Sequence, residues 1–333
     1  MKRKLLPLAI GAAIAMPSVA LAGPTVYGKV NVTVESYDND TDDSSDAYDQ
    51  WEVNSNASRL GVKGKEKISD NLSAIYKAEY QIDVDAGDDV FKQRNIYGGF
   101  KGGFGEVIVG KFDTPVKTSQ KKVDLFNDYE LGDIKNVLAG ENRTSNNIQY
   151  TTPDMGGFKA KLAVMPGEGE CDESKGDDCD DGLADGISAS VAYDQDGIYV
   201  ALAMDSEVTS KFGGFEGKTD IMRLVAQANI DMFQAGIIYQ TAEPSDSDDG
   251  DAEQDALILS GSMKVGSDGK VKLQYGMSEI DEIEQETTQI ALGYEHKLSK
   301  QTKVFTHYVN LEDDTDGTTD EESTIAFGME HKF

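Results

Sequence analysis

Apolar and polar residues alternate along short segments of this chain, most clearly at its end. From Ser323 to Phe333 one face carries Ile325, Phe327, Met329, His331 and Phe333, and the other carries Thr324, Ala326, Gly328, Glu330 and Lys332. A period of two with one apolar face is the pattern of a β-strand that has hydrocarbon on one side and water on the other. The pattern predicts a strand of a transmembrane β-barrel that ends on an aromatic residue.

The same alternation, together with turn signals, predicts an all-β chain with sixteen antiparallel strands. They lie near 25–37, 51–66, 72–82, 91–101, 105–112, 144–152, 157–165, 186–194, 197–205, 218–228, 232–242, 255–265, 269–278, 287–297, 302–311 and 323–333. Seven short turns alternate with eight long loops. An even strand number with both termini on the side of the short turns is the topology of a bacterial single-chain barrel.

The N-terminus has the features of a signal peptide. Lys2, Arg3 and Lys4 precede an apolar run from 5 to 15, and Ala20-Leu21-Ala22 supplies the small residues of a cleavage site. We expect residues 1–22 to be removed between Ala22 and Gly23, leaving one barrel domain over 23–333.

No later segment has eighteen apolar residues without a charge, so a transmembrane helix is not predicted. An exported chain of this kind enters a membrane only as a closed barrel, because an open sheet edge would leave backbone groups unpaired in lipid. The alternative is a soluble periplasmic or secreted β protein.

The chain is strongly acidic. Its 61 Asp and Glu residues outnumber 31 Lys and Arg residues, which gives a net charge of −30, and loss of the three basic residues of the signal segment makes it −33. Such a chain repels nucleic acid. The mean hydropathy of −0.46 is compatible with a barrel, since only the outer face of each strand must be apolar.

The acidic residues gather in the predicted loops. The clusters are Asp38 to Asp49, Glu168 to Asp185, Glu243 to Glu253, Glu279 to Glu286 and Glu312 to Glu322. They are either solvated surface or weak collectors of Ca²⁺, which also bridges anionic lipopolysaccharide. No other cofactor or metal is expected. An EF-hand at Asp38 to Asp43 is rejected, because Asp43 stands where that loop requires glycine.

The chain contains two cysteines, Cys171 and Cys179, within one acidic loop. We expect a disulfide between them, because an exported chain meets an oxidising compartment. Zinc binding is not expected, since the neighbouring residues are carboxylates and no histidine lies close.

The interval from Asp113 to Arg143 interrupts the alternation. About thirty residues exceed an ordinary connection, so a function or internal packing is expected. The interval is either a surface excursion or a segment that folds inward and narrows the lumen. Residues 118–129 are compatible with a short helix.

Several motifs give the chain a resemblance to a known family. They are Val26-Tyr27-Gly28-Lys29, Ser58 to Gly64, Lys92 to Gly98, Val109 to Pro115 and the terminal Phe333. In order and spacing, from Val26 to Phe333, they resemble the trimeric general diffusion porins of Gram-negative outer membranes. Lys111 departs from the family, which usually has arginine there; lysine keeps the charge but lacks the planar fork.

The resemblance implies a fold and a set of partners. It implies a homotrimer of 16-stranded barrels in the outer membrane, with residues 113–143 as the inward-folded third loop. The expected partners are outer-membrane lipid and lipopolysaccharide, the barrel-assembly machinery, for which Phe333 would be the assembly signal, and small hydrophilic solutes that diffuse through.

Strand parity places charged residues in the predicted lumen. Arg or Lys on the lipid side costs about 2 to 4 kcal/mol at mid-depth, so charged faces should point inward. The basic set is Lys29, Arg59, Lys63, Lys77, Arg94, Lys111 and Arg143, where Arg94 and Lys111 rest partly on the resemblance. The acidic set is Glu79, Asp113, Asp124, Asp128, Glu130, Asp133 and Glu141. Opposite charges across a narrow gap sort solutes by size and charge without a chemical step, and the acidic loops favour cations slightly.

Three other functions stay open. A substrate-specific channel for sugar or phosphate would use an aromatic track, for which the long loop offers Phe126 and Tyr129. An enzyme finds little support, because the chain has three histidines and no hydrolase, Walker or zinc motif. A calcium-linked surface scaffold or adhesin rests on the acidic loops alone.

Overall fold

The computed structural model describes residues 23–41, 47–85, 90–169, 182–246 and 252–333. The predicted signal peptide with Ala22, as well as Cys171 and Cys179, lie outside the described residues. The cleavage and disulfide predictions therefore stay predictions.

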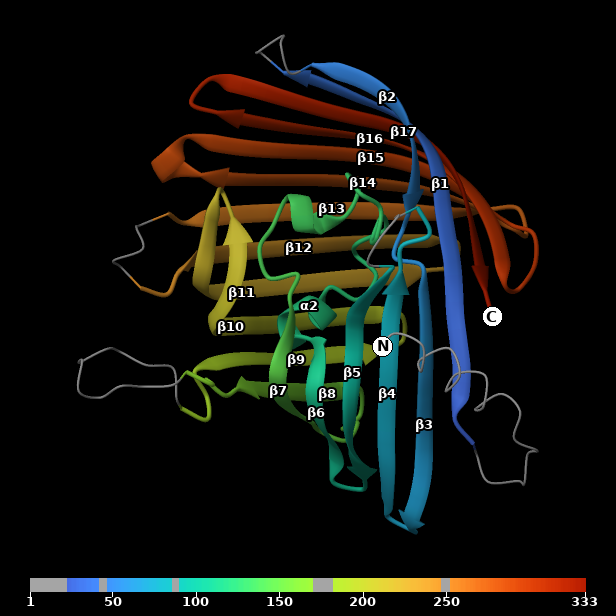
Figure 1. The fold of residues 1–333 in the computed structure, drawn as a ribbon, viewed down its shortest axis with the longest axis vertical. Coiled ribbons are helices and arrows are strands. Elements are labelled where there is room, and N and C mark those ends of the chain that lie inside the picture. Colours follow the sequence, from blue (N-terminus) through green and yellow to red (C-terminus); the bar gives the residue numbers. More distant parts are fainter. Residues whose placement is uncertain (1–22, 42–46, 86–89, 170–181, 247–251) are drawn as a thin grey trace, which may run out of the picture.

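The described chain consists almost entirely of strands (Figure 1). They are β1 (Thr25–Thr41), β2 (Tyr48–Ser55), β3 (Arg59–Ser69), β4 (Leu72–Ile82), β5 (Phe91–Gly102), β6 (Gly105–Asp113), β7 (Arg143–Thr151), β8 (Phe158–Met165), β9 (Gly186–Gln195), β10 (Ile198–Phe212), β11 (Phe215–Ile230), β12 (Phe233–Pro244), β13 (Gln254–Val265), β14 (Gly269–Ile280), β15 (Gln285–Lys297), β16 (Thr302–Thr315) and β17 (Thr318–Lys332).

The strands form one closed antiparallel barrel. Strand β1 pairs with β17 along one edge and with β2 and then β3 along the other. Every further neighbour pair, including β9 with β10, is also antiparallel. Because β2 and β3 follow each other along the same edge of β1, the barrel has sixteen strand positions, as predicted. Closure matters because it leaves no open sheet edge around the wall.

The predicted strand 51–66 is interrupted between β2 and β3. Ala57 has a φ of +47°, which a strand does not contain. Buried hydrogen bonds hold this break: the Asn31 backbone N–H donates to Ser58 Oγ at 2.9 Å, and Asn56 Nδ2 donates to Thr33 Oγ1 at 2.8 Å. Alternation alone could not reveal such a local side-chain network.

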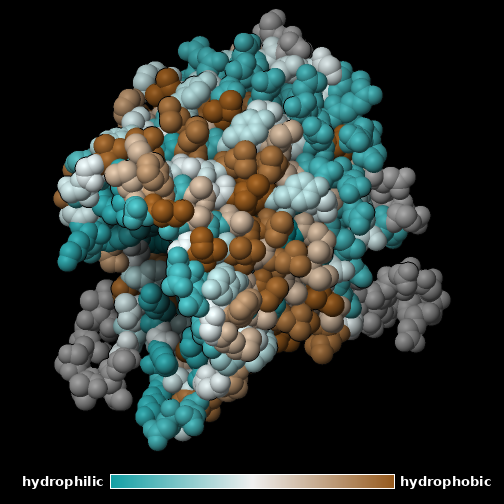
Figure 2. All heavy atoms as spheres, turned by 180° about the vertical axis from the view of Figure 1, so that it is seen from behind, coloured by the Kyte–Doolittle hydropathy of each residue, from teal (hydrophilic) through white to brown (hydrophobic). Residues whose placement is uncertain are grey.

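The two faces of the barrel differ in chemistry. On β10 buried and exposed residues alternate over nearly the whole strand. On β11 the exposed Leu224 lies next to the fully buried Arg223, and on β14 the exposed Leu273 lies next to the fully buried Gln274. Hydrophobic side chains gather over a broad part of the outside, which Figure 2 shows. The polar face is therefore turned inward, and the apolar face is turned outward.

The chain ends close the barrel. Gly28 on β1 donates its backbone N–H to the Phe333 carbonyl at 3.0 Å, and Phe333 donates back to the Gly28 carbonyl at 3.1 Å. The aromatic terminus thus continues the pairing of β17 with β1 to the last residue. Within the part of the chain that the structure describes, no helix is long and apolar enough to cross a membrane.

Candidate functional site

The long interval between β6 and β7, here called segment 114–142, begins with the helix α2 (Pro115–Ser119). Thr114 caps it by accepting from the Lys117 backbone N–H at 3.1 Å, and Pro115 occupies the first turn. The helix predicted over 118–129 is wrong, since α2 ends at Ser119. Positive φ values at Lys121 and Asp128 prevent its continuation. Residues 134–136 form the 3₁₀ turn η1 (Ile134–Asn136).

Segment 114–142 packs against side chains of the barrel wall. Val123, Ile134, Val137 and Leu138 are buried in one cluster with residues of β10 to β13, including Ile238 and Ile258. The helix α2 lies against β9 and β10 (Figure 1). The surrounding hydrogen bonds come from wall side chains to the segment's backbone, such as Tyr199 Oη to the Ser119 carbonyl at 2.9 Å. The apolar side chains of the segment and those of the wall therefore form one shared core.

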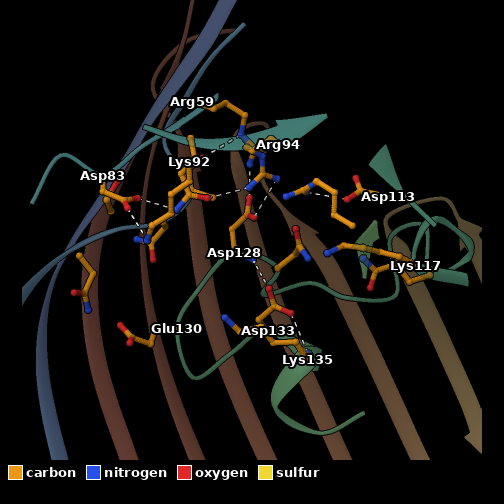
Figure 3. A pocket seen from close by; sticks show the side chains of 18 of the residues that line it. Arg59, Asp83, Lys92, Arg94, Asp113, Lys117, Asp128, Glu130, Asp133 and Lys135 are labelled. Carbon is orange, nitrogen blue, oxygen red and sulfur yellow. Dashed lines mark hydrogen bonds and ion pairs between the residues drawn. The ribbon is translucent and has the colours of Figure 1, made fainter. Parts of the chain in front are cut away.

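The tip of segment 114–142, at Asp128, meets cationic side chains on β1, β3 and β5. Lys29 Nζ lies 3.0 Å from Asp128 Oδ2, Arg59 also pairs with this oxygen, and Arg94 Nη2 lies 3.9 Å from Oδ1. Figure 3 shows Arg59 and Arg94 directed toward Asp128. Burial would raise the pKa of Asp128, but Lys29, Arg59 and Arg94 together hold it below its usual value.

A second carboxylate, Glu79 on β4, shares these cations. It lies 3.2 Å from Arg94 Nε, 3.2 Å from Lys77 Nζ and 4.0 Å from Arg59 Nη1, and it accepts from Tyr27 Oη at 2.8 Å. A further ion pair joins the two residues that flank segment 114–142: Arg143 Nη2 lies 2.8 Å from Asp113 Oδ1. The basic wall is thus neutralised in part by carboxylates that touch it.

Two cavities border this cluster. One, of about 780 Å³, is lined by Asp83, Lys92, Glu130 and Arg143 among others, and we call it the loop-side cavity. The other, of about 690 Å³, is lined by Lys29, Lys270, Glu295 and Phe333 among others, and we call it the terminus-side cavity. Arg59, Asn127 and Asp128 line both. The contact of Asp128 with Arg59 therefore lies where the two cavities meet.

Ten of the fourteen residues predicted to line the lumen border one of the two cavities. They are Lys29, Arg59, Arg94, Arg143, Glu79, Asp113, Asp124, Asp128, Glu130 and Asp133. Lys77 lies behind this layer, paired with Glu79. Lys63 is exposed, with Nζ 4.8 Å from the centroid of the Tyr27 ring.

The positions of Lys111 and Glu141 contradict the prediction. The pairing of β6 with β7 shifts between Gly110 and Phe112. Lys111 pairs with Ile96, its Nζ lies 3.4 Å from Ser145 Oγ, and it borders neither cavity but a hollow that the exposed Val109 also lines. Strand parity does not hold across such a bulge. Glu141 is buried in an ion pair with Arg223 at 2.8 Å and borders neither cavity.

Sequence reasoning missed the charged residues of the second half of the barrel. Arg223 is fully buried, and Lys272 and Lys303 each lie 2.9 Å from Glu295 Oε1. Parity was a usable signal, since Arg223 alternates with Met222 and Leu224.

Two carboxylates of segment 114–142 that border the cavities are shifted toward the neutral form. Burial raises the pKa of Asp124 well above its ordinary value, and the charge of Asp133 adds to this. Burial, followed by the charges of Glu52 and Glu35, raises the pKa of Glu130. Over the described residues no group of three His, Cys, Asp or Glu side chains is arranged to hold a metal ion.

Comparisons with known proteins agree with this architecture. A family model described as Gram-negative porin matches residues 9–316. Outer membrane porin protein 32 of Delftia acidovorans is 31% identical over 322 residues, which is 92% of this chain and 88% of that protein. The major outer membrane protein P.IB of Neisseria sicca is 31% identical over 185 residues, about half of each chain.

Solved structures show the same fold. The anion-selective porin from Comamonas acidovorans superposes with a TM-score of 0.79 at 24% identity, covering 94% of this chain and all of that one. A loop-deletion mutant of OmpT, an outer membrane protein of Vibrio cholerae, has a TM-score of 0.70 at 18% identity, with coverage of 94% and 100%. The chain forms an outer-membrane diffusion channel and belongs to the Gram-negative porin family.

Proposed function

We propose that the channel passes ions and small hydrophilic solutes by passive diffusion, without a chemical step, and that segment 114–142 forms its narrowest point. The observation that carries this proposal is the contact of Asp128 with Lys29 and Arg59, which joins the segment to the opposite wall between the two cavities. A solute that crosses from one cavity to the other must pass this contact.

We further propose a weak preference for anions. The terminus-side cavity is lined by seven Lys and Arg side chains against five carboxylates, and the loop-side cavity by seven against six. Burial favours the neutral form of Asp124 and of Glu130, which acts in the same direction. This reverses the expectation from the acidic loops, because salt screens charges beyond about 8 to 10 Å and the narrow part then dominates.

A sugar-specific channel is less well supported. Phe126 has none of its surface exposed and Tyr129 has 4%. Tyr129 stacks on His307 with ring centroids 4.5 Å apart, and Phe126 lies edge-on to the same ring at 6.3 Å. These two rings pack into the wall, so they offer little surface to a passing sugar.

The partners of the channel follow from the same proposal. We propose a homotrimer that lies in outer-membrane lipid and lipopolysaccharide, with Phe333 as the signal for the barrel-assembly machinery. The exposed apolar face supports contact with lipid. The pairing of Phe333 with Gly28 supports the role of Phe333 in barrel assembly. A solved form of Vibrio cholerae OmpT, at 18% identity and a TM-score of 0.66, is described as a trimer.

The test is the current through purified protein in a planar bilayer that separates two potassium chloride concentrations. We expect ohmic current with a reversal potential of the sign for chloride preference. A reversal potential of the opposite sign would overturn the anion preference. In liposomes, entry of small sugars but not of large ones would support passive sieving, whereas micromolar block by one solute would overturn it.

A further inference from the structure

Five strands of the wall, β11 to β15, each contribute one buried glutamine to segment 114–142, and β12 adds the partly exposed Gln234, which donates to the Lys122 carbonyl at 2.7 Å. The five are Gln227, Gln240, Gln254, Gln274 and Gln289. All are buried, and Gln240, Gln274 and Gln289 have no exposed surface. Their partners in the segment are backbone atoms, so the contacts do not depend on the segment's side chains.

The bonds are spread over the segment from Lys122 to Ala139. Gln227 accepts from the Lys122 backbone N–H at 3.2 Å, and Gln274 accepts from Leu125 at 2.9 Å while it donates to the Gly132 carbonyl at 3.1 Å. The remaining bonds to carbonyl groups run from Gln289 to Leu131 at 2.6 Å and to Asp133 at 3.3 Å, from Gln254 to Val137 at 3.2 Å and from Gln240 to Ala139 at 3.0 Å. An amide can donate and accept at once, so one side chain satisfies both kinds of backbone group.

Three glycines on the same strands make room for the segment's apolar side chains. A Cβ atom on Gly236 of β12 would stand 2.9 Å from Val123 Cγ2, and one on Gly276 of β14 would stand 3.0 Å from Val137 Cγ2. On Gly293 of β15 it would stand 3.0 Å from Phe126 Cε1. Any larger residue at these positions would push the segment away from the wall.

The tip of the segment is held differently. Asp128 reaches β1 and β3 through ion pairs with Lys29 and Arg59. Ion pairs weaken with salt and are lost when the carboxylate is protonated, whereas bonds between neutral amides and backbone groups respond to neither. The body and the tip of the segment should therefore respond differently to the medium.

We propose that the five glutamines and three glycines form a seat that positions segment 114–142 and keeps the channel's width constant as the salt concentration changes. Two buried charged contacts also hold the body of the segment, the pair of Arg223 with Glu141 and the bond from Lys272 Nζ to the Leu125 carbonyl at 2.8 Å, and burial protects them from screening by salt. The channel then does not close by movement of the segment's body, and the Asp128 contact is the one most sensitive to salt. This inference rests on the proposed function, in which the segment is the narrowest point.

The first test removes part of the seat. Gln274→Leu combined with Gln289→Leu deletes bonds to Leu125, Gly132, Leu131 and Asp133. Gln149→Leu is the matched control, because Gln149 is a buried glutamine of β7 whose amide donates to Thr151 within its own strand. We expect folded barrels in all cases, steady current in the control, and flickering current with closure at lower voltage in the double variant. Steady current together with unchanged trypsin resistance of the double variant would overturn the proposal.

The second test restores the seat covalently. The 3.0 Å from a Gly276 Cβ to Val137 Cγ2 matches the separation of about 3 Å between a Cβ and the distant sulfur of a disulfide. Val137→Cys with Gly276→Cys, in a background with Cys171→Ser and Cys179→Ser, should form a bond and return the double glutamine variant to steady current until it is reduced. Failure of the pair to oxidise would overturn the seat's geometry.

Two readouts separate this inference from the proposed function. Trypsin cleavage at the lysines of segment 114–142 reports whether the segment is loosened, and the current reports whether it narrows the channel. Increased cleavage with unchanged current would support the seat and overturn the role of the segment as the narrowest point. Unchanged cleavage with altered current would overturn the seat.

Discussion

Arg223 on β11 donates from Nη1 to Glu141 Oε1 at 2.8 Å, and neither side chain has more than 5% of its surface exposed. The same guanidinium donates to the Val116 carbonyl at 3.2 Å and to the Ala139 carbonyl at 2.9 Å. It therefore ties the beginning and the end of segment 114–142 to one point of the wall. This is a buried, charged counterpart to the neutral bonds of the glutamines.

Arg223→Met should destabilise the barrel strongly. It leaves Glu141 buried without its main partner, a change that costs about 3 to 5 kcal/mol. Burial already raises the pKa of Glu141 against the opposing effect of Arg223, so the loss should grow as pH rises above this pKa and Glu141 ionises. Urea unfolding at several pH values measures it. Adding Glu141→Gln should recover most of the stability, and a double variant as unstable as the single one would refute the explanation.

Asp128→Asn should make the channel more selective for anions. The substitution removes the carboxylate that neutralises Lys29 and Arg59. Two unit charges 4 Å apart interact by about 1 kcal/mol in water, so the permeability ratio should change by up to about five-fold. The reversal potential in a salt gradient measures this. Asp154→Asn, in an exposed turn paired with Lys159, is the control and should change nothing.

Acidification from pH 7 to pH 5 should also shift the reversal potential toward anions. Burial and the nearby Glu52 and Glu35 raise the pKa of Glu130, so this carboxylate takes up a proton above the ordinary glutamate value of about 4.3. Its negative charge is then lost from the loop-side cavity. Glu130→Gln should reduce the shift, and an equal shift in this variant would assign the effect to another group. Asp128, with its lowered pKa, should stay ionised in this range.

Gly28→Ala should lower the yield of folded barrel. The added Cβ would stand 2.5 Å from Phe333 Cζ and 2.6 Å from the Arg59 carbonyl oxygen, and such overpacking costs typically 1 to 3 kcal/mol. The fraction of protein with the fast migration of a folded barrel on unheated gels measures this. Gly98→Ala serves as the control, because nothing lies within 4 Å of its Cβ position. Equal yields of the two variants would show that closure at Phe333 tolerates the extra atom.

The strands could be predicted because alternation is a property of each strand by itself. Residues 72–82 are predicted and observed as a strand with the same bounds. The break at Ala57 and the bulge before Phe112 were missed, since they depend on a positive φ and on pairing with neighbours. The parity of Lys111 was wrong for this reason.

The site was predicted less completely than the fold. The meeting of Asp128 with Lys29 and Arg59 joins residues up to 99 positions apart, and parity placed both sets in the lumen without showing that they touch. Glu141 was assigned to the lumen because its partner Arg223 was not recognised. The role of the glutamines could not be predicted from the sequence, because a neutral polar residue on an inward face does not indicate which groups it contacts.

The central claim is that the polar face lines the path of the ions and that the apolar face meets lipid. Cysteine substitution in a background without Cys171 and Cys179 tests it most directly, with Asp128→Cys on the inward segment and Leu224→Cys on the exposed outer face of β11. A charged, water-soluble thiol reagent should change the current through the Asp128→Cys channel and leave the Leu224→Cys channel unaffected. No change at position 128, or an equal change at position 224, would contradict the account.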